Sequence, residues 1–199
     1  GELKVKPLLT GEADGEPWAE KANQLRLYSG AEVFADPSNI RTLIEQHELI
    51  TLGGSRYLLV EFDFGLPGSV LLRTLEAIAQ RGLVPVVAHP ERYDAVQRDP
   101  GLAAWCFSRG MLLQLNKGSL LGLLGSRAED TALHLLSHGL AHLIASDAHD
   151  DRFRTTGFRS LLPVLEPICH PDYIALLLHG NPRRILRDEP IPIPPLQSD

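Results

Sequence analysis

The sequence has 199 residues, enough for one domain with a substantial hydrophobic core. Hydrophobic residues make up 44% of it and charged residues 22%, as in ordinary globular proteins. The net charge of −6 and the pI near 5.7 argue against nucleic acid or an anionic membrane as the main partner. No apolar run reaches the ~18 residues of a membrane span, so we predict no membrane insertion.

The cysteines indicate the redox compartment. Cys106 and Cys169 lack CxxC spacing, and no secretory signal pattern is visible. We therefore predict two reduced thiols in a cytoplasmic protein.

Five short apolar runs predict β-strands. They lie at 25–28 (running into 30–33), 56–62, 84–89, 111–115 and 140–145. Segments with helical spacing of apolar residues alternate with them: from 36–38 onward, then 67–79, 99–108, 126–137, 158–166 and 171–179, with a last turn at 182–186. Residues 126–129 fit a capping box, and the Pro-rich tail at 190–199 is expected to be extended or disordered. Alternating strands and helices predict an α/β fold with a parallel sheet or barrel.

Metal-ligating side chains recur where the predicted strands end. Four of the five strands end in or near one: Glu32, Glu61, His89, and Asp147 with His149. The carboxyl ends of parallel strands meet at one edge, where α/β proteins bind ligands. Carboxylates with imidazoles suit Mn, Fe, Co or Zn, and five such groups are enough for two or three ions. Clusters of this kind activate water and hold the oxygens of a phosphoryl group.

Two further spacings support this hypothesis. In a strand, residues i and i+2 point the same way, so Asp147 and His149 would face one centre. Arg92 follows His89 by three residues and would bind a phosphate oxygen through its guanidinium.

Each residue also has a purely structural interpretation. Glu32 and Glu61 are alternatively solvated charges, and His89 a satisfied core histidine. Asp147 would also suit a turn or a helix cap. Arg92 would also suit a surface pair with Glu91 or Asp94.

Other motifs are set aside. His134 and His138 are spaced i, i+4, but the HExxH glutamate is absent. No glycine-rich segment completes a P-loop, and Cys106 lies inside a predicted helix without a phosphate-binding loop after it.

Five segments together resemble one family. They are Gly30–Val33, Ala88–Tyr93, Gln114–Gly122, Ala145–His149 and Asn181–Leu186. In this order they resemble the CpsB/CapC/YwqE-type protein-tyrosine phosphatases of bacterial capsule and exopolysaccharide loci, within the PHP (polymerase and histidinol phosphatase) superfamily. The resemblance covers about residues 25–190. It implies a distorted (β/α)7 TIM-like barrel with a trinuclear metal site, commonly manganese, that dephosphorylates the tyrosine-rich tail of a bacterial tyrosine autokinase.

The resemblance also implies residue roles. Glu32 would be the bridging carboxylate, and Glu61, His89, Asp147 and His149 would be the other metal ligands. Arg92 would bind phosphate, and Arg154 would be a second phosphate-binding arginine, with Arg152 as its alternative.

The N-terminal part departs from the family pattern. The family opens with His-x-His, whereas the first histidine here is His47. We therefore expect a PHP-type domain at 1–189 that is N-terminally incomplete and lacks its first strands. Two alternatives follow: a catalytically incomplete fragment or binding module of this fold, or a phosphatase acting on a small phosphate ester such as histidinol phosphate. Formation of a homo-oligomer is compatible with either.

Overall fold

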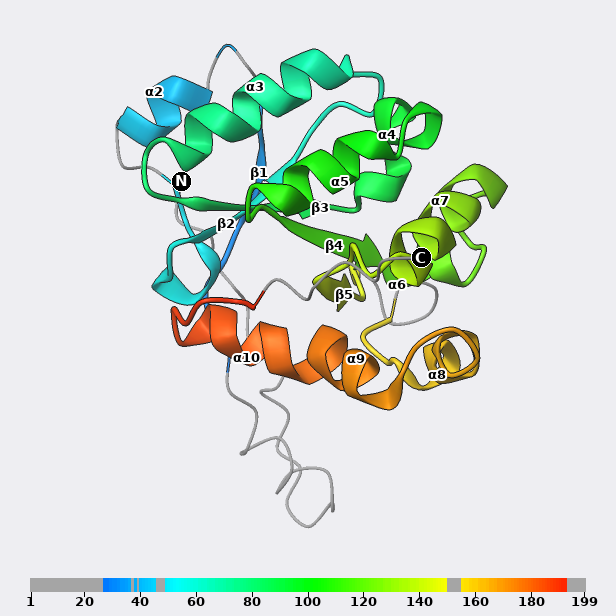
Figure 1. The fold of residues 1–199 in the computed structure, drawn as a ribbon. Coiled ribbons are helices and arrows are strands. Elements are labelled where there is room, and N and C mark those ends of the chain that lie inside the picture. Colours follow the sequence, from blue (N-terminus) through cyan, green and yellow to red (C-terminus); the bar gives the residue numbers. More distant parts are fainter. Residues whose placement is uncertain (1–26, 37, 39, 46–48, 150–154, 193–199) are drawn as a thin grey trace.

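Five parallel strands form the centre of the molecule (Figure 1). The computed structural model describes residues 27–36, 38, 40–45, 49–149 and 155–192. Within these ranges the strands are β1 (Glu32–Phe34), β2 (Tyr57–Glu61), β3 (Val84–Ala88), β4 (Leu112–Asn116) and β5 (Leu143–Ala145). They are paired in chain order, with β1 and β5 at the two edges. The predicted α/β fold with a parallel sheet is confirmed, but the described sheet is open and not a closed barrel.

Helices connect the strands and follow the last of them. They are α2 (Ile40–Glu45), α3 (Gly68–Ala79), α4 (Asp94–Arg98), α5 (Gly101–Ser108), α6 (Lys117–Leu120), α7 (Ser126–Ser137), α8 (Leu162–Leu165), α9 (Pro171–Ala175) and α10 (Asn181–Leu186). Short 3-10 helices lie at Leu52–Gly54, Pro90–Arg92 and Arg159–Leu161, and a π-helix joins α9 to α10 at Leu176–Gly180. None of the described helices combines the length and apolar character needed to cross a membrane.

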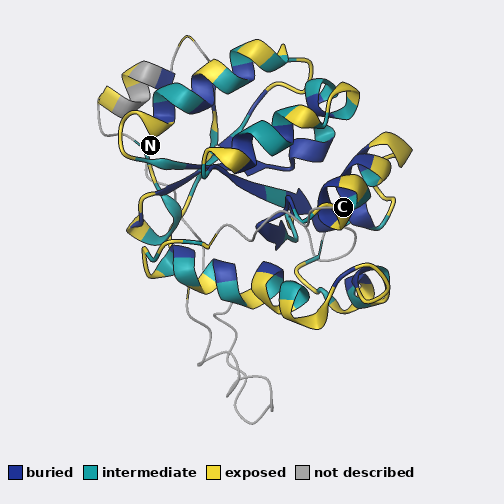
Figure 2. Cartoon of the chain, in the orientation of Figure 1, coloured by how far each residue is buried: buried dark blue, intermediate teal, exposed yellow. Residues whose placement is uncertain are grey.

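The two faces of the sheet are buried against different helices. Leu58, Val60 and Leu113 pack with residues of α3, α5 and α7 in the larger core. Their neighbours Tyr57 and Leu112 point the other way and pack with Ile185 of α10. Figure 1 shows α3 and α5 on one side of the sheet and α10 on the other, and Figure 2 shows the strands as its most buried part. Because both faces are covered, the central strands are nearly continuous apolar runs.

Two local predictions were wrong. Residues 27–30 are not in a strand, and β1 begins only at Glu32, so Glu32 opens this strand instead of ending it. Residues 25 and 26 lie outside the described residues. The predicted capping box at 126–129 is absent as well, because Ser126 is already helical and Gly125 is the N-cap, without a side-chain bond.

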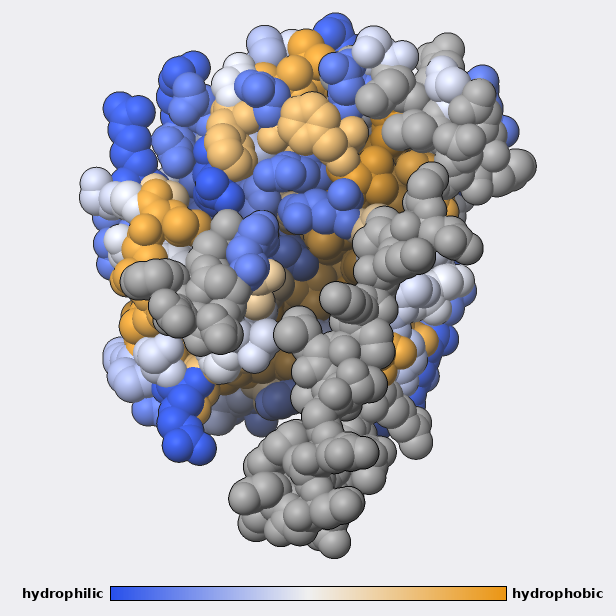
Figure 3. All heavy atoms as spheres, turned by 180° about the vertical axis from the view of Figure 1, so that it is seen from behind, coloured by the Kyte–Doolittle hydropathy of each residue, from blue (hydrophilic) through white to orange (hydrophobic). Residues whose placement is uncertain are grey.

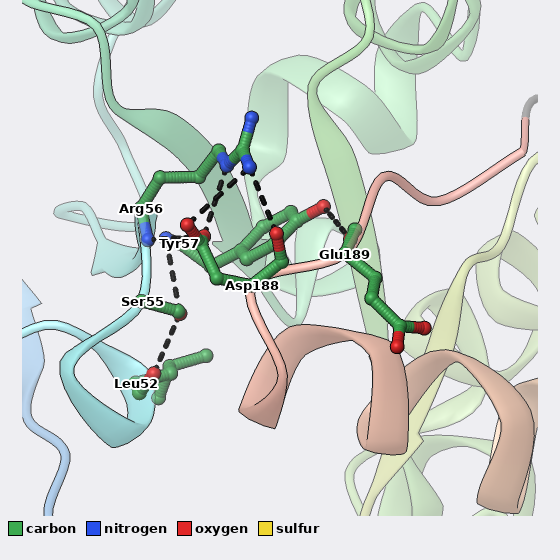
Figure 4. Close-up of polar contacts among 6 residues, drawn as sticks. All are labelled: Leu52, Ser55, Arg56, Tyr57, Asp188 and Glu189. Carbon is green, nitrogen blue, oxygen red and sulfur yellow. Dashed lines mark hydrogen bonds and ion pairs between the residues drawn. The ribbon is translucent and has the colours of Figure 1, made fainter.

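The C-terminal segment is tied to the beginning of β2 (Figure 4). The Asp188 carboxylate accepts hydrogen bonds from the backbone N–H of Arg56 (2.8 Å) and from its Nε (2.9 Å). The Tyr57 hydroxyl donates to the Glu189 carbonyl at 2.7 Å. These contacts join the segment after α10 to the beginning of β2.

Large hydrophobic side chains also remain at the surface. Leu27 is 82% exposed, Tyr28 54% and Phe34, in the edge strand β1, 51%. Seen from behind, the molecule shows apolar patches beside hydrophilic ones (Figure 3). The edge strand is thus less well covered than the centre of the sheet.

Candidate metal centre

Three predicted ligands converge on one point. His89 Nε2 lies 3.2 Å from a carboxylate oxygen of Glu32 and 3.3 Å from one of Glu61. One donor atom from each residue lies within 4.8 Å of the other two. The His89 side chain is only 2% exposed, whereas the glutamates are about one-third exposed at 31% and 30%. The three groups therefore form a partly open pocket of donors backed by a buried imidazole.

Strand alternation explains where Glu61 lies. It ends β2 and shares its face with Tyr57 and Leu59, the face that α10 covers. Glu32 enters the same face from β1, where it is paired with Leu59. The two carboxylates thus come from neighbouring strands.

His89 reaches these glutamates through an exceptional backbone conformation. Continued alternation would place it on the same face as Val87, toward the larger core. However, β3 ends at Ala88, and His89 has φ 33°, in the left-handed region. Such a conformation in a non-glycine residue is uncommon and concentrates at functional sites. It lets the imidazole point toward Glu61.

Tyr93 locks the ends of β2 and β3 together. Its ring is fully buried, edge-on to Phe62, and its hydroxyl accepts a hydrogen bond from the Phe62 N–H at 3.1 Å. Burial raises the pKa of Tyr93, so the phenol stays neutral at ordinary pH. Since Phe62 follows Glu61 directly, this bond fixes one glutamate relative to the turn after His89.

The donor set fits a divalent cation. Two carboxylates held side by side repel each other unless a positive charge lies between them. Two oxygens and one imidazole nitrogen suit Mn, Fe, Co or Zn better than Ca. His89 Nδ1, the ring nitrogen that faces away from the glutamates, is buried without a hydrogen-bond partner in the described part of the chain.

Arg92 lies beside this group. Its guanidinium carbon is 4.3 Å from the centre of the Phe64 ring, and the same ring contacts His89 edge-on at 5.9 Å. The alternative of a surface pair between Arg92 and Glu91 or Asp94 finds no support, because Glu91 is fully buried and Asp94 pairs with Arg98. Arg92 itself is only partly buried, so its guanidinium remains accessible to a ligand.

Asp147 and His149 do not join the three-residue group. Both follow the end of β5 at Ala145, and Asp147 has φ 46°, so the expectation that they share a strand face was wrong. His149 Nδ1 lies 2.9 Å from the Asp147 carbonyl oxygen, and the His149 side chain is 58% exposed. Asp147 is only 11% exposed and accepts a 2.6 Å hydrogen bond from Asn116. Arg152 and Arg154 lie outside the described residues.

Comparison with known proteins identifies the family. The family model described as capsular polysaccharide synthesis, CpsB/CapC, matches residues 15–187. The chain belongs to the CpsB/CapC family. The resemblance read from the motifs is thereby confirmed.

Three relatives show how much of the family the chain covers. It is 29% identical over 148 residues to tyrosine-protein phosphatase YwqE of Bacillus subtilis (strain 168), covering 74% of this chain and 58% of YwqE. It is 34% identical over 125 residues to putative tyrosine-protein phosphatase CapC of Staphylococcus aureus, covering 63% and 49%. It is 28% identical over 175 residues to tyrosine-protein phosphatase CpsB of Streptococcus pneumoniae, covering 85% and 72%. The chain thus spans only about half to three-fifths of YwqE and CapC.

The fold is also similar to a solved structure. It belongs to the crystal structures of YwqE from Bacillus subtilis and CpsB from Streptococcus pneumoniae, which are described as unique metal-dependent tyrosine phosphatases. The TM-score is 0.78 at 26% identity, with 91% of this chain and 72% of the other covered.

Three buried polar residues of this CpsB/CapC-family chain were missed as candidates from the sequence. Glu91, Asn116 and Lys117 are each at most 4% exposed. Burial raises the pKa of the Glu91 carboxyl, although neighbouring polar groups of Ser119 and Asn116 oppose this. All three lie within the motif segments, at the end of the buried strand β4 or within three residues after β3 or β4. The sequence signal that could have identified them is a run of polar residues at the end of an apolar strand.

Proposed function

We propose that the chain is part of a metal-dependent phosphatase that hydrolyses phosphotyrosine on a bacterial tyrosine autokinase. This activity would regulate capsule or exopolysaccharide synthesis in the cytoplasm. Membership in the CpsB/CapC family supports the reaction class, and the free, buried Cys106 and Cys169 are compatible with a reducing compartment.

The convergence of Glu32, Glu61 and His89 carries this proposal. In a parallel sheet these side chains come from three successive strands, and their donor atoms meet where active sites of α/β proteins lie. Surface carboxylates without a ligand would be expected to point apart into water, because their like charges repel, whereas these two approach one buried imidazole. The complete distorted (β/α)7 barrel belongs to the same proposal and is supported by the similarity to the YwqE and CpsB structure.

The roles of the residues follow from their chemistry. Glu32, Glu61 and His89 would hold divalent ions, proposed to be Mn²⁺, with Asp147 and His149 as further ligands. Such ions activate water and neutralise phosphoryl charge. Arg92 would bind the equatorial oxygens of the phosphoryl group through its planar guanidinium, as would Arg154 from outside the described residues. The Phe64 ring would keep the Arg92 guanidinium beside the metal ligands.

The substrate is tested with the full-length protein that carries this chain. Its turnover of a phosphotyrosine peptide is compared with that of small phosphomonoesters, histidinol phosphate included, with manganese and after chelation. We expect hydrolysis of the peptide that chelation abolishes and manganese restores. Hydrolysis of the small esters alone, or activity that persists without metal, would overturn the proposal.

A second candidate is a catalytically incomplete fragment or binding module of this fold. It is favoured by one observation, namely that only three of the predicted ligands meet in the described residues. Elemental mass spectrometry of this chain, purified after manganese supplementation, separates the two. Two or more tightly held ions per chain would favour the enzyme, and a value near zero would favour the second candidate.

A further inference from the structure

Asn116, the last residue of β4, uses its backbone N–H and both polar atoms of its side chain in hydrogen bonds. Its N–H donates to a carboxylate oxygen of Glu91 at 3.0 Å, and its Oδ1 accepts from the Gly118 N–H at 2.7 Å. The side-chain nitrogen therefore faces Asp147, to which it donates at 2.6 Å. A short bond to a carboxylate is among the stronger hydrogen bonds in proteins. Asn116 is 2% exposed, so its side chain makes these bonds away from solvent.

Lys117, the next residue, contacts a second stretch of chain beyond β5, at Thr155 and Gly157. Its ammonium donates to the carbonyl oxygens of Thr155 and Gly157, the latter at 3.0 Å, and lies 5.9 Å from the Phe158 ring. A lysine that is only 4% exposed is costly unless its charge is solvated by the protein. Among the described residues these carbonyls are what solvates the ammonium. The ammonium in turn restrains the backbone at Thr155 and Gly157.

We propose that Asn116 and Lys117 are positioning residues for two described stretches of chain that follow β5. Asn116 fixes the carboxylate of Asp147, and Lys117 fixes the backbone at Thr155 and Gly157. Outer contacts of this kind orient ligands and set metal affinity. The effect on metal binding rests on the proposed function, whereas the effect on these two stretches does not.

Asn116→Ser separates the two bonds of this side chain. A serine still caps α6 through the Gly118 N–H but is too short to reach Asp147. In the full-length protein we expect Mn²⁺ affinity, measured by calorimetry, to fall roughly 10- to 100-fold, with the melting temperature of the metal-free protein close to that of the parent. Gln114→Ala, two residues earlier on β4, is the matched control and should keep the parent affinity. Parent affinity in Asn116→Ser would overturn the role of Asn116.

Lys117→Met removes the charge and keeps the apolar stem. We expect faster amide hydrogen exchange at 155–158 in the metal-free protein, without a change in helix α7. Arg109→Met, which removes an exposed cation stacked on Trp105, is the control and should leave 155–158 unchanged. Unchanged exchange in Lys117→Met would overturn the role of Lys117.

Exchange at 146–149 is measured in Asn116→Ser as well, and faster exchange is expected there. This readout needs neither metal nor activity. If the parent binds no Mn²⁺ and hydrolyses no phosphotyrosine, the proposed function fails, while the exchange data still decide whether the two residues hold these two stretches.

Discussion

His89 Nε2 lies 3.2 Å from a carboxylate oxygen of Glu32, although Glu32 opens β1 and His89 follows β3. Glu61, at the end of the strand between them, approaches the same nitrogen at 3.3 Å. Two acidic side chains thus lie beside one buried imidazole. A cation bound there would relieve the repulsion between the carboxylates.

Removing one carboxylate should therefore weaken metal binding. For Glu61→Gln we expect a loss of Mn²⁺ affinity on the order of 100-fold, since even outer contacts to ligands contribute ~10- to 100-fold. The increase in melting temperature on adding Mn²⁺ should shrink accordingly. Asp63→Asn is the control, because the exposed Asp63 side chain accepts a hydrogen bond from the nearby Gly65 N–H, a bond that an asparagine oxygen can also accept. Equal Mn²⁺ affinity in Glu61→Gln and the parent would exclude Glu61 as a ligand.

Arg92 should affect turnover and leave metal binding intact. We expect Arg92→Ala to lower kcat by about 10²–10³-fold, the usual cost of one charge-stabilising group. Phe64→Ala should lower it less, because the guanidinium would remain but lose the ring beneath it. Both variants should bind the parent's amount of Mn²⁺, and Arg98→Ala, on the exposed side of α4, serves as the control. Unchanged kcat in Arg92→Ala would remove Arg92 from the proposed mechanism.

Acid should destabilise the fold through His142. This side chain is 1% exposed, its Nδ1 accepts from the Leu113 N–H, and its ring packs on Phe107. Burial lowers the pKa of His142 from 6.5 to about 4. Between these values the unfolded chain binds the proton and the folded chain does not, so stability falls as the pH falls.

At ~1.4 kcal/mol per pH unit, His142 should account for a loss of about 3 kcal/mol between pH 6.5 and pH 4. His142→Asn keeps an acceptor near Leu113 but does not titrate, so its stability should depend less on pH in this window. Urea unfolding at several pH values measures the difference, with His138→Asn as an exposed control. An unchanged pH dependence in His142→Asn would contradict this origin of the acid sensitivity.

The bonds between Arg56 and Asp188 should stabilise the C-terminal segment. Asp188 has φ 54°, which asparagine and glycine tolerate better than alanine. We therefore expect the melting temperature to decrease in the order parent, Asp188→Asn, Asp188→Gly, Asp188→Ala. Differential scanning calorimetry tests this order. Glu45→Ala, which breaks a single exposed bond to Arg81, should have a smaller effect.

The positions of the central strands and the fold class could be predicted from the sequence. The apolar runs at 56–62 and 84–89 contain β2 and β3, the run at 111–115 contains all of β4 except Asn116, and the helix predicted at 126–137 has the observed bounds. These features depend on short-range periodicity, which the sequence displays directly. The sequence also predicted that Glu61 and His89 lie close together, because the carboxyl ends of parallel strands meet at one edge of the sheet. Assignment of all five metal ligands and of Arg92 and Arg154 remains a prediction.

The tertiary structure alone decided how the polar groups meet. The left-handed turn at His89, the burial of Glu91 and the bonds from Asn116 and Lys117 join residues on different strands and loops. Periodicity gives the face of a residue within one strand, but not the register between strands or the path of the chain after a strand ends. For the same reason the sequence indicated which residues suit a metal, while the pairing of β1, β2 and β3 determined which of them lie together.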